Sequence, residues 1–130
     1  MNRARYPEAT EAAGALVIRS AGAWFYFNAD HIRRQISDLL NQAPSGIKTV
    51  VIDFSLVPAV DVTAGGVLRG LARSLKARDI AIALAGLRDD VRENLTAVGA
   101  EQDLGPIPAH RTIEDCLRHV AASSPMKIPG

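Results

Sequence analysis

Apolar residues recur along this chain in two forms, short runs and stripes at helical spacing. Short apolar runs occupy residues 15–20, 47–54 and 80–85, and the continuous runs are typical of strands that are covered on both faces. Between them, residues 29–42 and 63–77 place apolar side chains three or four positions apart, as an amphipathic helix does. Strands that alternate with helices predict an α/β fold whose sheet is parallel in its later part.

Weaker signals complete the expected order of elements. Aromatic residues at 24–27 predict a second strand, joined to the first by a hairpin or tight bend at Gly22. The segment 88–98 has helical periodicity, and Thr112 begins a capping-box pattern before the last helix. The short segment 107–109, with Pro106 before it and Pro108 within it, favours an edge strand, because prolines cannot donate to a ladder. We therefore expect a mixed, largely parallel sheet of four to five strands with about four helices.

The periodic region marks one domain. Residues 1–13 are polar and alanine-rich without periodicity, which predicts a linker, and residues 123–130 carry two prolines, which predicts a flexible tail. Residues 14–122 remain as a single domain, and a chain of 130 residues with 48% hydrophobic composition can bury a substantial core.

Composition limits the classes of function. The formal net charge is +1 with acids and bases interspersed, so the clustered basic charge of a nucleic-acid-binding protein is missing. Cys116 is the one cysteine, which excludes an intramolecular disulfide and favours a reducing compartment. No apolar run approaches the ~20 residues of a membrane span, and the N-terminus lacks the apolar region of a signal peptide. We expect a soluble intracellular domain.

The residues at the N-terminus of the second expected helix are the candidates for binding or modification. Thr63 is expected to cap this helix, and Asp61 to brace the loop by accepting backbone N–H groups. Ala64, Gly65 and Gly66 would leave backbone N–H groups open at the helix start, a geometry that binds anions and phosphates. Close packing of the helix against the sheet explains the same glycines, and phosphorylation of Thr63 is a further alternative.

Other side chains suggest docking rather than catalysis. Arg69, Arg73 and Lys76 share one face of the same helix, either a solvated face or one that meets anionic lipid or another part of the protein. Of the aromatic residues 24–27 we expect most in the core, and an exposed one would mark a docking surface. Cys116 lies on an apolar stripe and is expected in the core. No histidine or cysteine pair has metal-ligand spacing, so we expect no metal site and no catalysis.

The order of elements and two motifs resemble a STAS domain, the module of bacterial anti-sigma factor antagonists and of the cytoplasmic C-termini of SulP-type anion transporters. The resemblance spans residues 15–121 and centres on the strand 50–55 and the loop 61–65. The segment 25–30 is similar to the Phe-x-Asn-Ala stretch with which SulP domains enter their first helix, and Arg19 also fits that branch.

The resemblance implies a cytoplasmic regulatory and assembly domain of a sulfate-class anion permease, on the inner side of the inner membrane. Its partners would be the transmembrane domain of its own chain and, in some arrangements, a second copy, with GTP or ATP as a ligand to consider near Thr63. The antagonist branch carries Asp-Ser-Ser/Thr-Gly at its phosphorylation loop, and Val62 and Ala64 depart from that pattern. The alternative is a free-standing antagonist that phosphorylation of Thr63 switches and that binds a kinase or anti-sigma factor.

Overall fold

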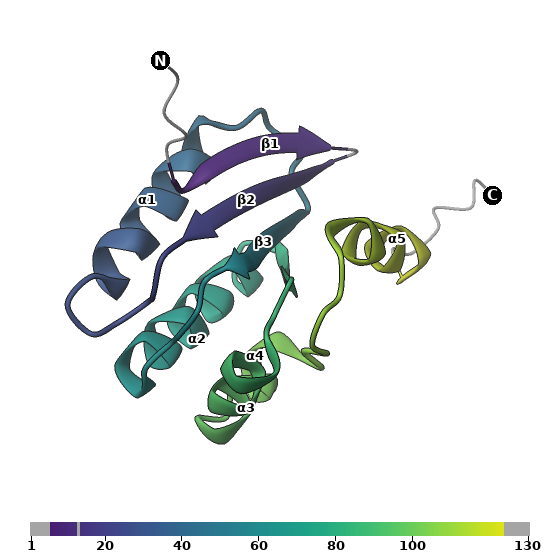
Figure 1. The fold of residues 1–130 in the computed structure, drawn as a ribbon. Coiled ribbons are helices and arrows are strands. Elements are labelled where there is room, and N and C mark those ends of the chain that lie inside the picture. Colours follow the sequence, from purple (N-terminus) through teal and green to yellow (C-terminus); the bar gives the residue numbers. More distant parts are fainter. Residues whose placement is uncertain (1–5, 13, 124–130) are drawn as a thin grey trace, which may run out of the picture.

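A computed structural model describes residues 6–12 and 14–123 of the chain. Its elements are β1 (Glu8–Ala12), β2 (Ala15–Ala21), α1 (Ala29–Gln42), β3 (Thr49–Leu56), α2 (Val62–Lys76), β4 (Ala81–Ala85), α3 (Asp89–Ala97), α4 (Glu101–Leu104) and α5 (Ile113–Ser123). The strands form one sheet in the order β1-β2-β3-β4 (Figure 1). The pair β1–β2 is antiparallel and the other pairs are parallel, so the predicted α/β fold with a largely parallel sheet is confirmed.

Helices cover the sheet on both faces because its central strands are apolar on both faces. Alternate side chains of β3 point to opposite sides, so Ile52 joins the large core under α1 and α2, whereas Val51 joins a smaller cluster with Cys116 of α5. Figure 1 shows α5 on the side of the sheet opposite α1 and α2. The predicted core position of Cys116 is confirmed, since this side chain is fully buried.

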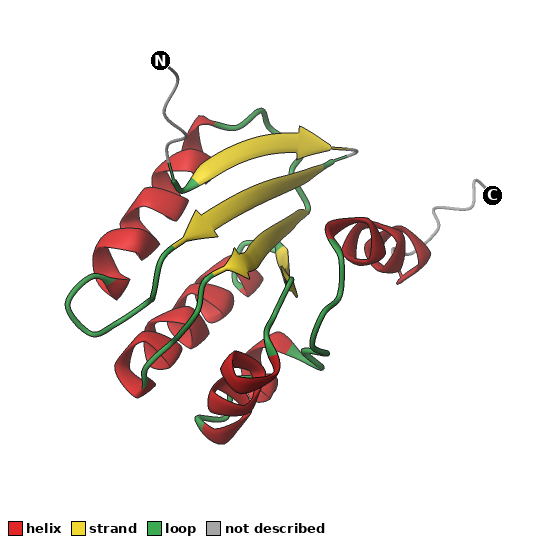
Figure 2. Cartoon of the chain, in the orientation of Figure 1, coloured by secondary structure: helices red, strands yellow, loops and turns green. Residues whose placement is uncertain are grey.

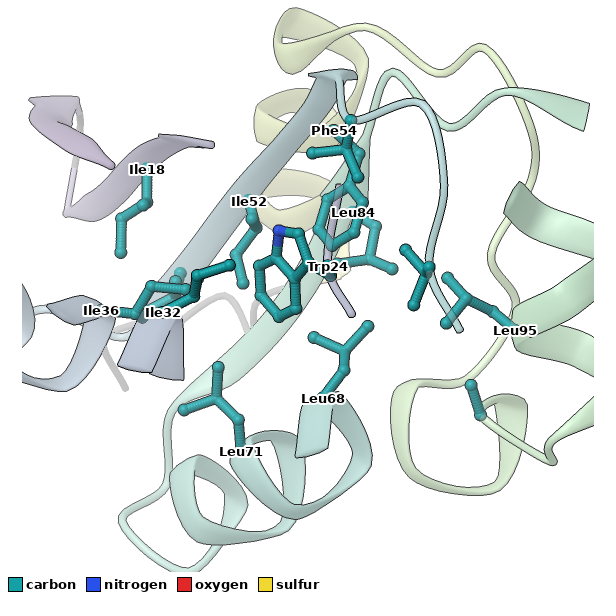
Figure 3. Close-up of a cluster of buried hydrophobic side chains, with 14 of the residues drawn as sticks. Ile18, Trp24, Ile32, Ile36, Ile52, Phe54, Leu68, Leu71, Leu84 and Leu95 are labelled. Carbon is teal, nitrogen blue, oxygen red and sulfur yellow. The ribbon is translucent and has the colours of Figure 1, made fainter. Parts of the chain in front are cut away.

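The large core is built around an aromatic pair. Trp24 is fully buried, its ring centroid lies 5.1 Å from that of Phe54, and its indole N–H donates to the Ser20 hydroxyl at 3.0 Å. Figure 3 shows Trp24 in the middle of the core side chains, between the strands and α2. The indole therefore ties the segment after β2 to the core, with its polar atom satisfied.

The prediction that residues 1–13 form a linker is wrong for residues 8–12, which form β1. This strand pairs with β2 from Glu8 opposite Arg19 to Ala12 opposite Ala15. An edge strand exposes much of its surface to solvent, so its polar side chains give no apolar signal in the sequence. The predicted tail lies outside the described residues except for Ser123, which ends α5.

Two further predicted strands are absent from the described residues. In 24–27 a single parallel bridge joins Trp24 to Val60, and the chain then turns, because the side-chain Oδ1 of Asn28 accepts the Phe25 N–H at 2.8 Å. Asn28 occupies the N-cap position of α1, but its side chain braces this turn and makes no cap hydrogen bond with the helix. The segment 107–109 pairs with no strand, since the prolines at 106 and 108 have no N–H to donate.

The predicted capping box at the start of α5 is confirmed. The Asp115 N–H donates to the Thr112 hydroxyl at 3.0 Å, and the Thr112 N–H donates to the Asp115 carboxylate at 3.3 Å. Hydrogen bonding from the Thr112 side chain, and then from its backbone N–H, lowers the pKa of Asp115. The short helix α4, which the sequence did not suggest, follows Gly99.

We expect Trp24→Ala to lower the free energy of unfolding by about 3–5 kcal/mol, because it empties the centre of the core. Urea denaturation followed by circular dichroism measures this change. Tyr26→Ala is the matched control, since Tyr26 lies two residues away but is 72% exposed, and we expect it to change stability by about 0.5 kcal/mol or less. Equal losses in the two variants would contradict the assignment of Trp24 to the centre of the core.

Candidate functional site

Two loops lie side by side at the carboxyl end of the parallel strands, residues 22–28 after β2 and residues 57–61 after β3. The Trp24 N–H donates to the Ala59 carbonyl at 2.9 Å, and the Asp61 N–H donates to the Trp24 carbonyl at 3.1 Å. Figure 2 shows both loops as green segments where the β2 and β3 arrows end. The loops thus extend the parallel pairing of the two strands beyond the sheet.

Asp61 connects these loops through its carboxylate. One carboxylate oxygen accepts the Ala64 N–H at 2.8 Å, and the other accepts the Tyr26 N–H at 2.8 Å. The first bond caps α2 and the second holds the loop that leads to α1. Asp61 therefore braces the loop as predicted, and its carboxylate also binds Tyr26, which lies 35 positions away in the sequence.

The prediction that Thr63 caps α2 is wrong, because Asp61 occupies the N-cap position. Val62 is the first residue of the helix, so Thr63 already lies within the first turn and its side chain is exposed. The N-cap is the residue just before the first helical position, and its side chain accepts a free N–H of the first turn. Thr63 is already inside that turn, so it does not take this place. Thr63 remains accessible to solvent, and its phosphorylation stays a prediction.

The glycines of this segment differ in their surroundings. A Cβ on Gly65 would lie 2.9 Å from the Val98 Cγ2, so this glycine allows α2 to pack against the end of α3 and not, as expected, against the sheet. Gly66 is exposed, and a Cβ there would meet no atom within 4 Å. Ala64 is buried and gives its N–H to Asp61. An anion at the start of α2 would meet the negative charge of Asp61, and nucleotide binding there stays a prediction.

Apolar side chains project from both loops into solvent. Tyr26 is 72% exposed, Phe27 is 69% exposed and Val62, beside Asp61, is 74% exposed. We call these three residues the aromatic surface. The prediction that most of residues 24–27 lie in the core is wrong, since Trp24 alone among them is buried. Tyr26 and Phe27 are the exposed aromatic residues, and an exposed one was expected to mark a docking surface.

The expected basic face of α2 is partly used inside the molecule. Arg69 donates to the Asp103 carboxylate at 2.5 Å and to the Val98 carbonyl at 2.8 Å, and its side chain is 24% exposed. Arg73 lies 3.5 Å from the same carboxylate, and Lys76 is exposed. The prediction of a shared docking face therefore fails for Arg69, which connects α2 to α4, and stays a prediction for Arg73 and Lys76.

Arg69 also sets the charge state of its partner. Its hydrogen bond is the main cause that lowers the pKa of Asp103, the nearby cations act in the same direction, and desolvation opposes them. Arg69 thus favours the ionised form of Asp103, and the carboxylate holds the guanidinium of Arg69 in place.

Other polar groups near this end of the sheet serve structural purposes. The Ser55 hydroxyl donates to the Asp53 carboxylate at 3.1 Å, and the Ser55 N–H donates to it at 3.0 Å, so the two residues close a turn at the end of β3. Burial raises the pKa of the Cys116 thiol, which keeps it protonated. In residues 6–12 and 14–123 no three acidic, histidine or cysteine side chains are grouped so as to bind a metal ion.

Comparison with known proteins places these features in a family. The family model described as STAS domain matches residues 6–116. A probable sulfate transporter of Mycobacterium tuberculosis is 30% identical over 100 residues, which are 77% of this chain and 18% of that protein. The chain thus spans less than a fifth of this curated relative. None of the helices in the described part of the chain is long and hydrophobic enough to cross a membrane.

Solved structures of two kinds share the fold. The inward-facing murine Slc26a9 anion transporter matches with a TM-score of 0.77 and 20% identity over 90% of this chain and 19% of that one. A putative anti-sigma factor antagonist of Thermotoga maritima matches with a TM-score of 0.72 and 16% identity, over 88% of this chain and 93% of that one. The predicted resemblance to STAS domains and sulfate transporters is confirmed.

Sequence reasoning missed the contacts that join distant segments. The hydrogen bond from Tyr26 to Asp61 and the ion pair of Arg69 with Asp103 link residues more than 30 positions apart, and no local periodicity encodes such pairs. One signal was available for the first pair, because an acid just before a helix is a frequent N-cap.

We expect Asp61→Ala to lower the free energy of unfolding by about 1–2 kcal/mol, since it removes the cap of α2 and leaves the Tyr26 N–H without its partner. Thr63→Ala should change it by about 0.5 kcal/mol or less. Urea denaturation of both variants measures the difference. Asp61→Asn should fall between them, because its amide keeps one acceptor oxygen. A larger loss for Thr63→Ala than for Asp61→Ala would restore Thr63 as the cap.

The lowered pKa of Asp103 predicts a pH dependence of stability. The folded-state pKa is below the unfolded one, so this carboxylate stabilises the fold at neutral pH and loses that effect as the pH falls through the folded-state value. The stability difference between wild type and Asp103→Asn should therefore shrink from about pH 7 to about pH 3. Urea denaturation across this range tests it, with exposed Asp38→Asn as control. A constant difference would contradict the prediction.

Proposed function

Since the chain belongs to the STAS domain family, we propose that it is the regulatory and assembly domain of a SulP-type anion transporter of the sulfate class. In this proposal it carries out no chemistry and lies on the cytoplasmic side of the membrane. The observation that carries the proposal is the match to a probable sulfate transporter, which covers 77% of this chain but 18% of that protein. A domain that corresponds to a small part of a transporter is expected to serve the remainder of it.

The candidate site supports a role in binding another protein. Its main polar group, Asp61, uses both carboxylate oxygens for internal hydrogen bonds, and three large apolar side chains, Tyr26, Phe27 and Val62, are exposed. Exposed apolar side chains that are clustered mark interaction sites on soluble domains. The partner in this proposal is the membrane-embedded part of the same transporter chain.

A second candidate function is that of a free-standing anti-sigma factor antagonist. The exposed Thr63 in the first turn of α2 favours it, since a kinase could reach its hydroxyl. A phosphate on Thr63 would gain from the helix N-terminus but would be repelled by the carboxylate of Asp61. Val62 and Ala64 stand where antagonists carry the Ser and the Gly of their phosphorylation loop, and this argues for the transporter.

An antibody raised against the chain tests the proposal in membrane and soluble fractions of the source organism. We expect a band far above 13.9 kDa, the mass of this chain, in the membrane fraction. Carbonate washing of the membranes controls for peripheral attachment and should leave the band in place. A soluble band near 13.9 kDa would refute the transporter proposal. A phosphate that is then lost in Thr63→Ala would support the antagonist.

A further inference from the structure

Building on the proposed function, we infer that the aromatic surface of Tyr26, Phe27 and Val62 is where this domain docks onto the membrane-embedded part of its own transporter chain. The inference assigns the contact to one end of the domain, the carboxyl end of strands β2 and β3. It rests on the rigidity of the surface, on its chemistry and on the place where the chain enters the fold.

The aromatic surface is held in one arrangement before any partner binds. The ring centroids of Tyr26 and Phe27 lie 5.4 Å apart in a T-shaped contact, and those of Phe25 and Phe27 lie 5.7 Å apart. Asp61 fixes the two loops to each other through the Tyr26 and Ala64 N–H groups. A surface that is ordered in advance loses little conformational entropy when it binds.

The chemistry of this surface fits a protein partner. Aromatic residues are enriched in the buried centres of protein interfaces, where they supply a large apolar area and, in tyrosine, a polar end. Tyr26 and Phe27 are joined to the segment that carries Val62, because the Asp61 carboxylate accepts the Tyr26 N–H and Val62 directly follows Asp61 in the chain. Each is about 70% exposed in the isolated domain, which leaves the apolar area without a cover.

The path of the chain supports this assignment. Strand β1 runs antiparallel to β2, and Glu8 lies opposite Arg19, three residues before Gly22 begins the first loop. The chain therefore enters the domain at the end of the sheet that carries the aromatic surface. In a transporter whose membrane-embedded part precedes this domain, the connection arrives at this end. The relative's chain extends well beyond this domain, since the match covers 18% of it, so a large partner is available in the same chain.

Cysteine labelling of the full-length membrane protein tests the inference. The single cysteine of this chain, Cys116, is buried, so an introduced cysteine is a clean reporter. In the variant Phe27→Cys, we expect the introduced thiol to react with a water-soluble maleimide at least about tenfold more slowly in the full-length protein than in the isolated chain. The reason is that docking would exclude the reagent from this side chain. Mass spectrometry of the peptide that contains the site measures the labelled fraction over time.

A matched control comes from the other end of the sheet. Ser45→Cys lies in the exposed turn between α1 and β3, and its labelling rate should change by about twofold or less. Val62→Cys is a second reporter within the aromatic surface, in case Phe27→Cys alters the loop. Circular dichroism of each isolated variant confirms that it folds as the wild type does.

Three outcomes would overturn the inference. Equal labelling of the Phe27 and Val62 reporters in the isolated and full-length proteins would show that the surface stays free. Equal protection of the Ser45 reporter would show general shielding instead of docking. Protection of the isolated chain by vesicles of phosphatidylglycerol and phosphatidylethanolamine alone would assign the surface to lipid. Each of these is distinct from failure of the proposed function, which would appear as a soluble band near 13.9 kDa.

Discussion

The carboxylate of Asp61 is the contact on which the end of this domain depends. It accepts one N–H from α2 and one from the loop before α1, both at 2.8 Å. Without it, the described hydrogen bonds between the two loops would be the two that the Trp24 backbone makes with Ala59 and Asp61. A carboxylate is suited to this position because its two oxygens accept from two directions, and hydrogen bonds to a charged acceptor are stronger than neutral ones.

This arrangement separates anchoring from recognition within one short segment. Trp24 is buried and secures the loop to the core, whereas Tyr26 and Phe27, two and three residues later, are exposed. The turn made by Asn28 produces the change of direction, since its side chain holds the Phe25 N–H. The core therefore supports the exposed aromatic side chains rigidly.

The same fold occurs in an anion transporter and in a putative anti-sigma factor antagonist, so the fold does not decide the function. The candidate site of this chain lies in the loops at the carboxyl end of the sheet. In this chain that end presents Val62 and aromatic side chains to solvent, and the acid beside them is satisfied internally. An apolar end suits lasting contact with a partner, whereas a switch that acts through charge needs polar groups that remain free.

The sequence by itself determined the elements whose side chains have a strong period or an unbroken apolar run. Helices α1 and α2 and strands β3 and β4 were predicted to within two residues at each end, because the burial of one face or both imposes that pattern locally. The exposed edge strand β1 gave no such signal, and the aromatic run at 24–27 gave a false one. Only the tertiary structure decided that the Asp61 carboxylate also accepts the Tyr26 N–H, which of the aromatic side chains are exposed, and that Arg69 binds Asp103. Each of these depends on residues far apart in sequence meeting in space, and a local pattern contains no information about such a meeting.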